Sequence, residues 1–167
     1  MILARFLSES RGAAATEFAL LVPMMLIVLF TGSEAGHFVW TQHKLTEAVR
    51  NGARYAARLQ IDDVCNGPTD VLAGANLTNV LLLTRTGQLA NTSARSVVPG
   101  WTDAQVDVDV SCESYVDTGI YSDLGAAGPI VTVRAANVAY PYLFGLLGGI
   151  GGSISLSAES STAVIGI

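Results

Sequence analysis

The feature that most constrains this chain is a run of sixteen residues without a charge, from Phe18 to Ser33 (FALLVPMMLIVLFTGS). A helix needs about 20 apolar residues to cross a bilayer core. The run reaches that length when it is extended back to Ala13, and a helix over 13–33 would be about 31 Å long. Pro23 removes one backbone donor within it, which membrane helices tolerate. We therefore predict a transmembrane helix over 13–33.

The charges around this segment predict its orientation. Arg5 and Arg11 precede it, whereas the ten residues that follow it contain Glu34 and no Lys or Arg. The positive-inside rule then places the N-terminus in the cytoplasm and residues 61–167 outside. The net charge of −5 argues against a nucleic-acid partner, because such binding needs a basic surface.

Three interpretations of the N-terminal region compete. The first is a plain single-span anchor, and the second is a signal peptide cleaved near Ser33–Ala35. The helical pattern continues through that point, which argues against the second. The third is a leader, residues 1–12, that is cut between Gly12 and Ala13, where Gly12 would leave an extended, accessible peptide bond.

Only the third interpretation provides a partner for Glu17, a carboxylate inside the apolar segment. Such a group is costly in a membrane unless it is paired or functional. After the cut, the new α-amine of one copy would lie at the same depth as Glu17 of a neighbour. We therefore predict Glu17 as an assembly residue and Gly12 and Ala13 as the processing site.

Three sequence segments carry a family resemblance: R-G-A-A-A-T-E-F-A-L at 11–20, N-G-A-R-Y-A-A-R at 51–58, and V-T-V-R at 131–134 with the following Tyr140-Pro141. They resemble the TadE-like minor pseudopilins of tight-adherence (Flp/Tad) pilus systems, a branch of the type IV pili. The resemblance is strong over 11–60, fair over 129–165 and weak between them.

The resemblance implies a minor pseudopilin-like subunit that acts in pilus assembly or initiation. It implies cleavage by a prepilin peptidase and, as partners, other pilin or pseudopilin subunits, pilus-assembly proteins and membrane lipid. It also implies a single-pass protein of the bacterial inner membrane with a periplasmic C-terminal domain, either retained there or carried into an extracellular pilus. The alternative is a single-span envelope protein with a protein-binding domain that is not processed as a pilin.

An amphipathic helix is predicted beyond the membrane, over 34–60. Its apolar positions recur with the period of one helix face: Phe38, Leu45, Val49, Gly52, Ala56 and Leu59. Arginines at 50, 54 and 58 form a second face, which we interpret as solvated rather than paired with acidic groups. With the membrane segment it predicts one helix over 13–60, about 72 Å long.

The remaining residues, 61–167, predict an extracytoplasmic α+β domain. Alternation predicts strands over 105–112, 130–139 and 153–164, with Ile154, Leu156 and Ala158 on one face of the last. A small antiparallel sheet would bury one face on the long helix in a pilin-like arrangement. The run 80–83 fits helix or strand, and a further helix is predicted over 84–98.

Two stretches of this domain, one apolar and one acidic, each allow more than one interpretation. The Gly-rich segment Tyr140–Gly152 fits a subunit contact, a membrane contact or a buried linker. Asp107 and Asp109, with Glu113 and Asp117, fit a solvated acidic face better than a Ca²⁺ site. Asn66-Gly67-Pro68 predicts a turn.

The two cysteines, Cys65 and Cys112, fall in the predicted outer domain, where an oxidising compartment would favour a disulfide over two free thiols. His37 and His43 are six residues apart and do not share a helix face, so we predict surface or interface histidines and no metal pair. No nucleophile–base set or phosphate-binding loop is evident. We predict neither a cofactor nor an enzymatic activity.

Overall fold

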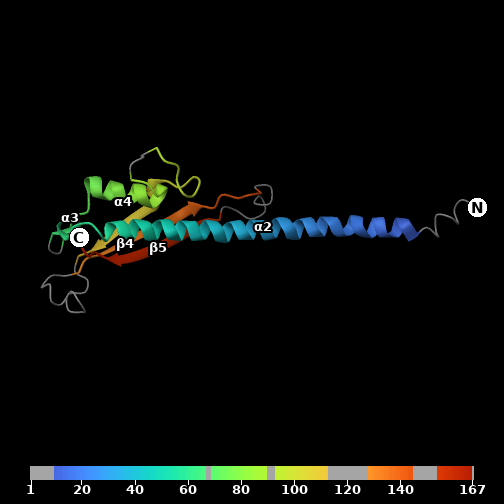
Figure 1. Ribbon diagram of the computed structural model, residues 1–167, viewed down its shortest axis with the longest axis horizontal. Coiled ribbons are helices and arrows are strands. Elements are labelled where there is room, and N and C mark those ends of the chain that lie inside the picture. Colours follow the sequence, from blue (N-terminus) through green and yellow to red (C-terminus); the bar gives the residue numbers. More distant parts are fainter. Residues whose placement is uncertain (1–9, 67–68, 90–92, 113–127, 145–153, 167) are drawn as a thin grey trace, which may run out of the picture.

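One helix, α2 (Ser10–Ala56), dominates the architecture. The computed structural model describes residues 10–66, 69–89, 93–112, 128–144 and 154–166. The 47 residues of α2 form a rod of about 70 Å whose N-terminal half projects away from the rest of the chain (Figure 1). It begins three residues before the predicted start and ends four residues before the predicted end. The N–H groups of Arg58 and Leu59 bond carbonyls only three residues back, and this tighter turn ends the α-helix.

A three-stranded antiparallel sheet packs on the C-terminal half of α2. Its strands are β3 (Val106–Ser111), β4 (Ile130–Ala139) and β5 (Ser155–Ala163), in the order β3-β4-β5. These are the three predicted strands, although β5 begins two residues later than expected. Ile154 therefore precedes the strand and is 44% exposed instead of facing the core.

Helix α2 and the sheet each bury one face against the other, which gives the chain its α+β architecture. In Figure 1, α2 lies across β4 and β5, and both strands contact it. The predicted stripe on α2 supplies Leu45, Val49, Gly52 and Ala56, all buried, with Phe38 and Leu59 at its edge. The facing strand residues include Val131, Val133, Val138 and Leu156, each at most 2% exposed.

Helix α4 spans Gly74–Thr86, so the predicted helix over 84–98 is wrong. The apolar run 80–83 is helical and packs on α2. Gly87 ends the helix in a left-handed conformation (φ 72°) and donates its N–H to the carbonyl of Leu83. The contact with α2, rather than an amphipathic pattern of its own, stabilises this short helix.

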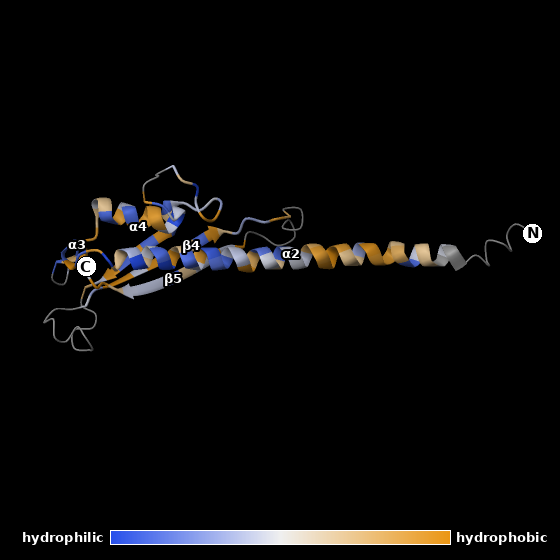
Figure 2. Ribbon diagram, viewed as in Figure 1, coloured by the Kyte–Doolittle hydropathy of each residue, from blue (hydrophilic) through white to orange (hydrophobic). Residues whose placement is uncertain are grey.

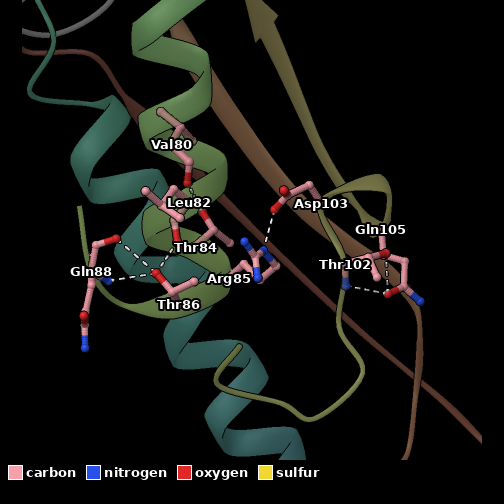
Figure 3. A network of polar contacts seen from close by, with 9 residues as sticks. All are labelled: Val80, Leu82, Thr84, Arg85, Thr86, Gln88, Thr102, Asp103 and Gln105. Atoms are coloured by element: carbon pink, nitrogen blue, oxygen red, sulfur yellow. Dashed lines mark hydrogen bonds and ion pairs between the residues drawn. The ribbon is translucent and has the colours of Figure 1, made fainter. Parts of the chain in front are cut away.

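Polar side chains close the end of α4 (Figure 3). The hydroxyls of Thr84 and Thr86 donate to carbonyls one turn earlier, at 2.7 Å each. Arg85 pairs with Asp103 in the short 3-10 helix η1 (Asp103–Gln105), which links α4 to the turn before β3.

A small hairpin follows α2. The helix α3 (Ile61–Val64) leads into β1 (Cys65–Asn66), which pairs with β2 (Thr69–Asp70). Gly67 and Pro68 of the predicted turn lie outside the described residues. A disulfide joins Cys65 to Cys112, just after β3, so the hairpin is linked covalently to the sheet. This is the paired alternative of the two that the sequence left open.

Candidate functional site

The N-terminal half of α2 presents an uncovered apolar surface. We call residues 18–29 the exposed helix segment; it shows orange in Figure 2. Its large apolar side chains are between 45% and 76% exposed: Phe18, Leu20, Leu21, Met24, Met25, Leu26, Ile27, Val28 and Leu29. Within the described residues, α2 is the one helix that is long and apolar enough to cross a membrane, and its most apolar window is not buried at all.

Glu17 precedes this segment and is exposed. Within the described part of the chain, no hydrogen bond or ion pair reaches its carboxylate. Among the residues that the structure describes, this carboxylate at the end of an apolar helix therefore has no counter-ion, which fits the expectation of a partner from another copy.

Gly12 and Ala13 lie in the first turn of α2, and not in an extended stretch as we expected. Three alanines, Ala13 to Ala15, follow Gly12; alanine is the strongest helix former, so the helix continues back through this position. Gly12 is exposed, and a Cβ atom built on it would meet nothing within 4 Å.

A second cluster joins α2, beyond the exposed helix segment, to the chain that follows β4. We call it the collar: Glu34, His37, Tyr140, Leu143 and Phe144. The two carboxylate oxygens of Glu34 accept hydrogen bonds from the backbone N–H groups of Leu143 (3.2 Å) and Phe144 (3.1 Å). The Tyr140 hydroxyl donates to the main-chain carbonyl of Glu34 at 3.1 Å and lies 2.9 Å from Nδ1 of His37.

The collar shifts the ionisation of two of its members. Burial acts to raise the pKa of Glu34, but the Tyr140 hydroxyl and the two backbone N–H groups together outweigh it, so the pKa is lowered. Burial is also the main reason why the pKa of Tyr140 rises from 10.0 to about 12, with the Glu34 carboxylate adding to the effect. The site therefore holds an anionic Glu34 against a neutral Tyr140.

A shallow groove of about 280 Å³ adjoins the collar. Its wall combines rings, prolines and one amine: His37, Trp40, Thr41, Lys44, Val97, Pro99, Pro141, Tyr142 and Leu143. The ammonium of Lys44 lies 3.8 Å from the centroid of the Trp40 ring, a cation–π contact.

The structure also places the remaining residues that the sequence singled out. Arg50, Arg54 and Arg58 are exposed and make no ion pair with any described residue of the same chain. His43 is exposed, whereas His37 belongs to the collar. No group of three metal-ligating side chains occurs in the described residues, and Glu113 and Asp117 lie outside them.

Sequence reasoning missed the collar. One signal was available: Glu34 is the first charged residue after the apolar run, at the point where the predicted membrane helix would meet water. Its partners follow the Tyr140-Pro141 pair about a hundred residues later, and only the fold brings them together.

Comparison with known proteins adds one match. No curated protein and no solved structure resembles this chain significantly. A family model does match, and it covers the predicted processing site, the exposed helix segment and most of the stripe that packs on the sheet. Residues 12–54 of this chain match the TadE-like protein family.

Proposed function

We propose that this chain is a minor pseudopilin-like subunit of a Flp/Tad pilus system. It is made as a precursor, held in the bacterial inner membrane by residues 13–33, and acts in pilus assembly or initiation through contacts with other subunits. Its role is structural rather than enzymatic. The family match over residues 12–54 supports the pilus context.

The observation that carries the proposal is the exposed helix segment. Nine large apolar side chains in twelve residues stay uncovered while the same helix, further along, buries Leu45 and Val49 completely. Such a surface is unstable in water and needs lipid or the helices of neighbouring subunits. A helix that lies in lipid in one state and packs against the helices of neighbouring subunits in another serves both the anchored and the assembled subunit.

Glu17 sets the register in which the helices of neighbouring subunits pack. A prepilin peptidase cuts between Gly12 and Ala13, so the new α-amine stands four residues, about one helical turn, before Glu17. Within one helix this amine lies close to Glu17, and between two helices it reaches the Glu17 of a neighbour at the same depth. Charge pairing in a low-dielectric layer is strong, so a copy in the wrong register is disfavoured.

The position of the chain's amino terminus tests the proposal. Protein purified from the membranes of its own host is expected to begin at Ala13 by intact mass and terminal sequencing. A Gly12→Leu variant, which blocks the site by bulk, is expected to keep Met1 and remain in the membrane without supporting piliation. Native protein that retains residues 1–12 would instead favour the unprocessed envelope anchor with a protein-binding domain, and a start near Gly36 would indicate a cleaved signal peptide.

A further inference from the structure

The folded domain touches α2 inside the apolar run itself. The rings of Phe144 and Phe30 meet edge to face, with centroids 5.0 Å apart and planes at 64°. Phe30 lies four residues before Glu34, within the segment that is predicted to cross the bilayer. Figure 1 shows the chain after β4 running along α2 toward its N-terminal half, beyond the end of the sheet. Part of the domain therefore reaches the level at which the helix leaves the membrane.

The collar fixes this part of the chain at that level. The backbone N–H groups of Leu143 and Phe144 both end on the Glu34 carboxylate, so neither is left unsatisfied. An unpaired backbone group would be costly in an apolar layer. Paired as they are, these two residues can leave water with their backbone donors already bonded.

The side chains at this level suit a lipid surface. Leu143 is 52% exposed, and on the adjoining turns of α2 Val39 and Trp40 are each 53% exposed. Between Arg134 and Glu159 the sequence contains no charged residue. Tyr142 and Trp40 bring the amphipathic rings that gather where a membrane meets water.

We propose that residues Tyr142–Phe144 enter the outer interface of the bilayer and form a second membrane contact beside the helix. The occupant of this surface is phospholipid: its upper acyl chain lies against Leu143 and Phe144, and its headgroup lies level with the ring of Tyr142, whose hydroxyl already accepts a hydrogen bond from the N–H of Ile154. The contact fixes the height and the rotation of the domain relative to the membrane. It rests on the single-pass anchor of the proposed function, but it concerns residues that the anchor does not need.

Site-directed fluorescence tests the contact in the full-length chain. Because Cys65 and Cys112 are bonded to each other, an introduced cysteine is the thiol that reacts. Leu143→Cys is labelled with a polarity-sensitive dye and reconstituted in phosphatidylethanolamine–phosphatidylglycerol nanodiscs that contain acyl-chain spin-labelled lipid. Ile27→Cys, in the exposed helix segment, reports the anchor, and Ser161→Cys, on an exposed strand residue of β5, reports water.

The expected result is a blue-shifted and lipid-quenched dye at position 143, close to the behaviour at 27 and clearly different from that at 161. A dye at 143 that behaves like the one at 161 overturns the contact, and quenching at 27 then shows that the anchor itself is intact. A blue-shifted dye at 143 without lipid quenching overturns it too, because protein rather than lipid then covers this residue. Absence of quenching at both 27 and 143 refutes the anchor and the contact together.

Discussion

Gly52 of α2 and Thr84 of α4 stand so close that a Cβ atom on the glycine would overlap the Oγ1 atom of the threonine. Thr84 is fully buried, and its hydroxyl donates to the carbonyl of Val80 at 2.7 Å, so turning the side chain away from Gly52 would break this hydrogen bond. The absence of a side chain at position 52 therefore sets how closely the two helices approach.

Gly52→Ala is expected to destabilise the domain by about 1–3 kcal/mol, because overpacking outweighs the gain in helix propensity. The free energy of unfolding of the detergent-solubilised chain measures it. Gly36→Ala is the matched control, since a Cβ atom there meets nothing within 4 Å. It should be neutral or stabilising by up to about 1 kcal/mol.

A second substitution in the same pair separates steric overlap from other causes. Adding Thr84→Ala to Gly52→Ala removes the overlapping Oγ1 atom and should restore part of the lost stability, whereas adding Thr84→Ser keeps that atom and should restore none. A Gly52→Ala variant as stable as the parent would show that the helices can move apart freely.

The disulfide gives a second stability prediction. Cys65 and Cys112 are 47 residues apart in sequence. Closing a loop of that length contributes about 4 kcal/mol when the unfolded chain is treated as entropic. The double variant Cys65→Ser/Cys112→Ser should lose most of this in chemical denaturation, and reduction of the parent should produce the same loss. A reduced parent that matches the oxidised one would contradict the prediction.

Periodicity predicted those parts of the fold that depend on one element at a time. The stripe from Phe38 to Leu59 and the alternation in β3 each report which face of a single segment is buried. The short helix α4 was misplaced because the run 80–83 is too brief to show a period. Its end depends on Gly87, whose left-handed conformation a sequence pattern does not display.

The collar could not be predicted, for a different reason. Glu34 and Leu143 are 109 residues apart, and each is ordinary in its own neighbourhood. Their contact follows from how far β4 carries the chain along α2, and the strand order that determines this was not readable from alternation. Conversely, Glu17 could be singled out from sequence because its peculiarity, a charge beside an apolar run, is local.

The free energy of unfolding is expected to depend on alkaline pH through Tyr140. Its pKa is about 12 in the folded chain and 10.0 for an ordinary tyrosine. A raised pKa means that the neutral phenol stabilises the fold fully below pH 10, and that this contribution is lost as the pH rises toward 12. The loss should be on the order of 2 kcal/mol. Tyr140→Phe should flatten the fall in unfolding free energy between about pH 10 and 12 relative to the parent. A fall as steep in Tyr140→Phe as in the parent would contradict this assignment.

Substitution or protonation of Glu34 is expected to open the collar locally. Glu34→Gln replaces a charged acceptor by a neutral one, so the amides of Leu143 and Phe144 should exchange with deuterium roughly tenfold faster. Because the pKa of Glu34 is lowered, the carboxylate stabilises the collar above its unfolded pKa, and acidification through the lowered pKa should release the same amides. Glu47→Gln, an exposed carboxylate on the same helix, is the control. Unchanged exchange at 143 and 144 would show that other contacts hold this segment.

Glu17 predicts a defect in assembly without a defect in insertion. Glu17→Gln removes the counter-ion of a neighbour's α-amine while making the apolar segment cheaper to bury, so the protein should reach the membrane at least as well as the parent. Pilus filaments, counted by electron microscopy of cells in which the variant replaces the native gene, should fall by roughly tenfold, the effect of losing about 1.4 kcal/mol of pairing energy. Glu17→Asp keeps the charge and should recover part of the loss, and Glu47→Gln should cause none. Normal piliation with Glu17→Gln would mean that subunits find their register through apolar packing alone.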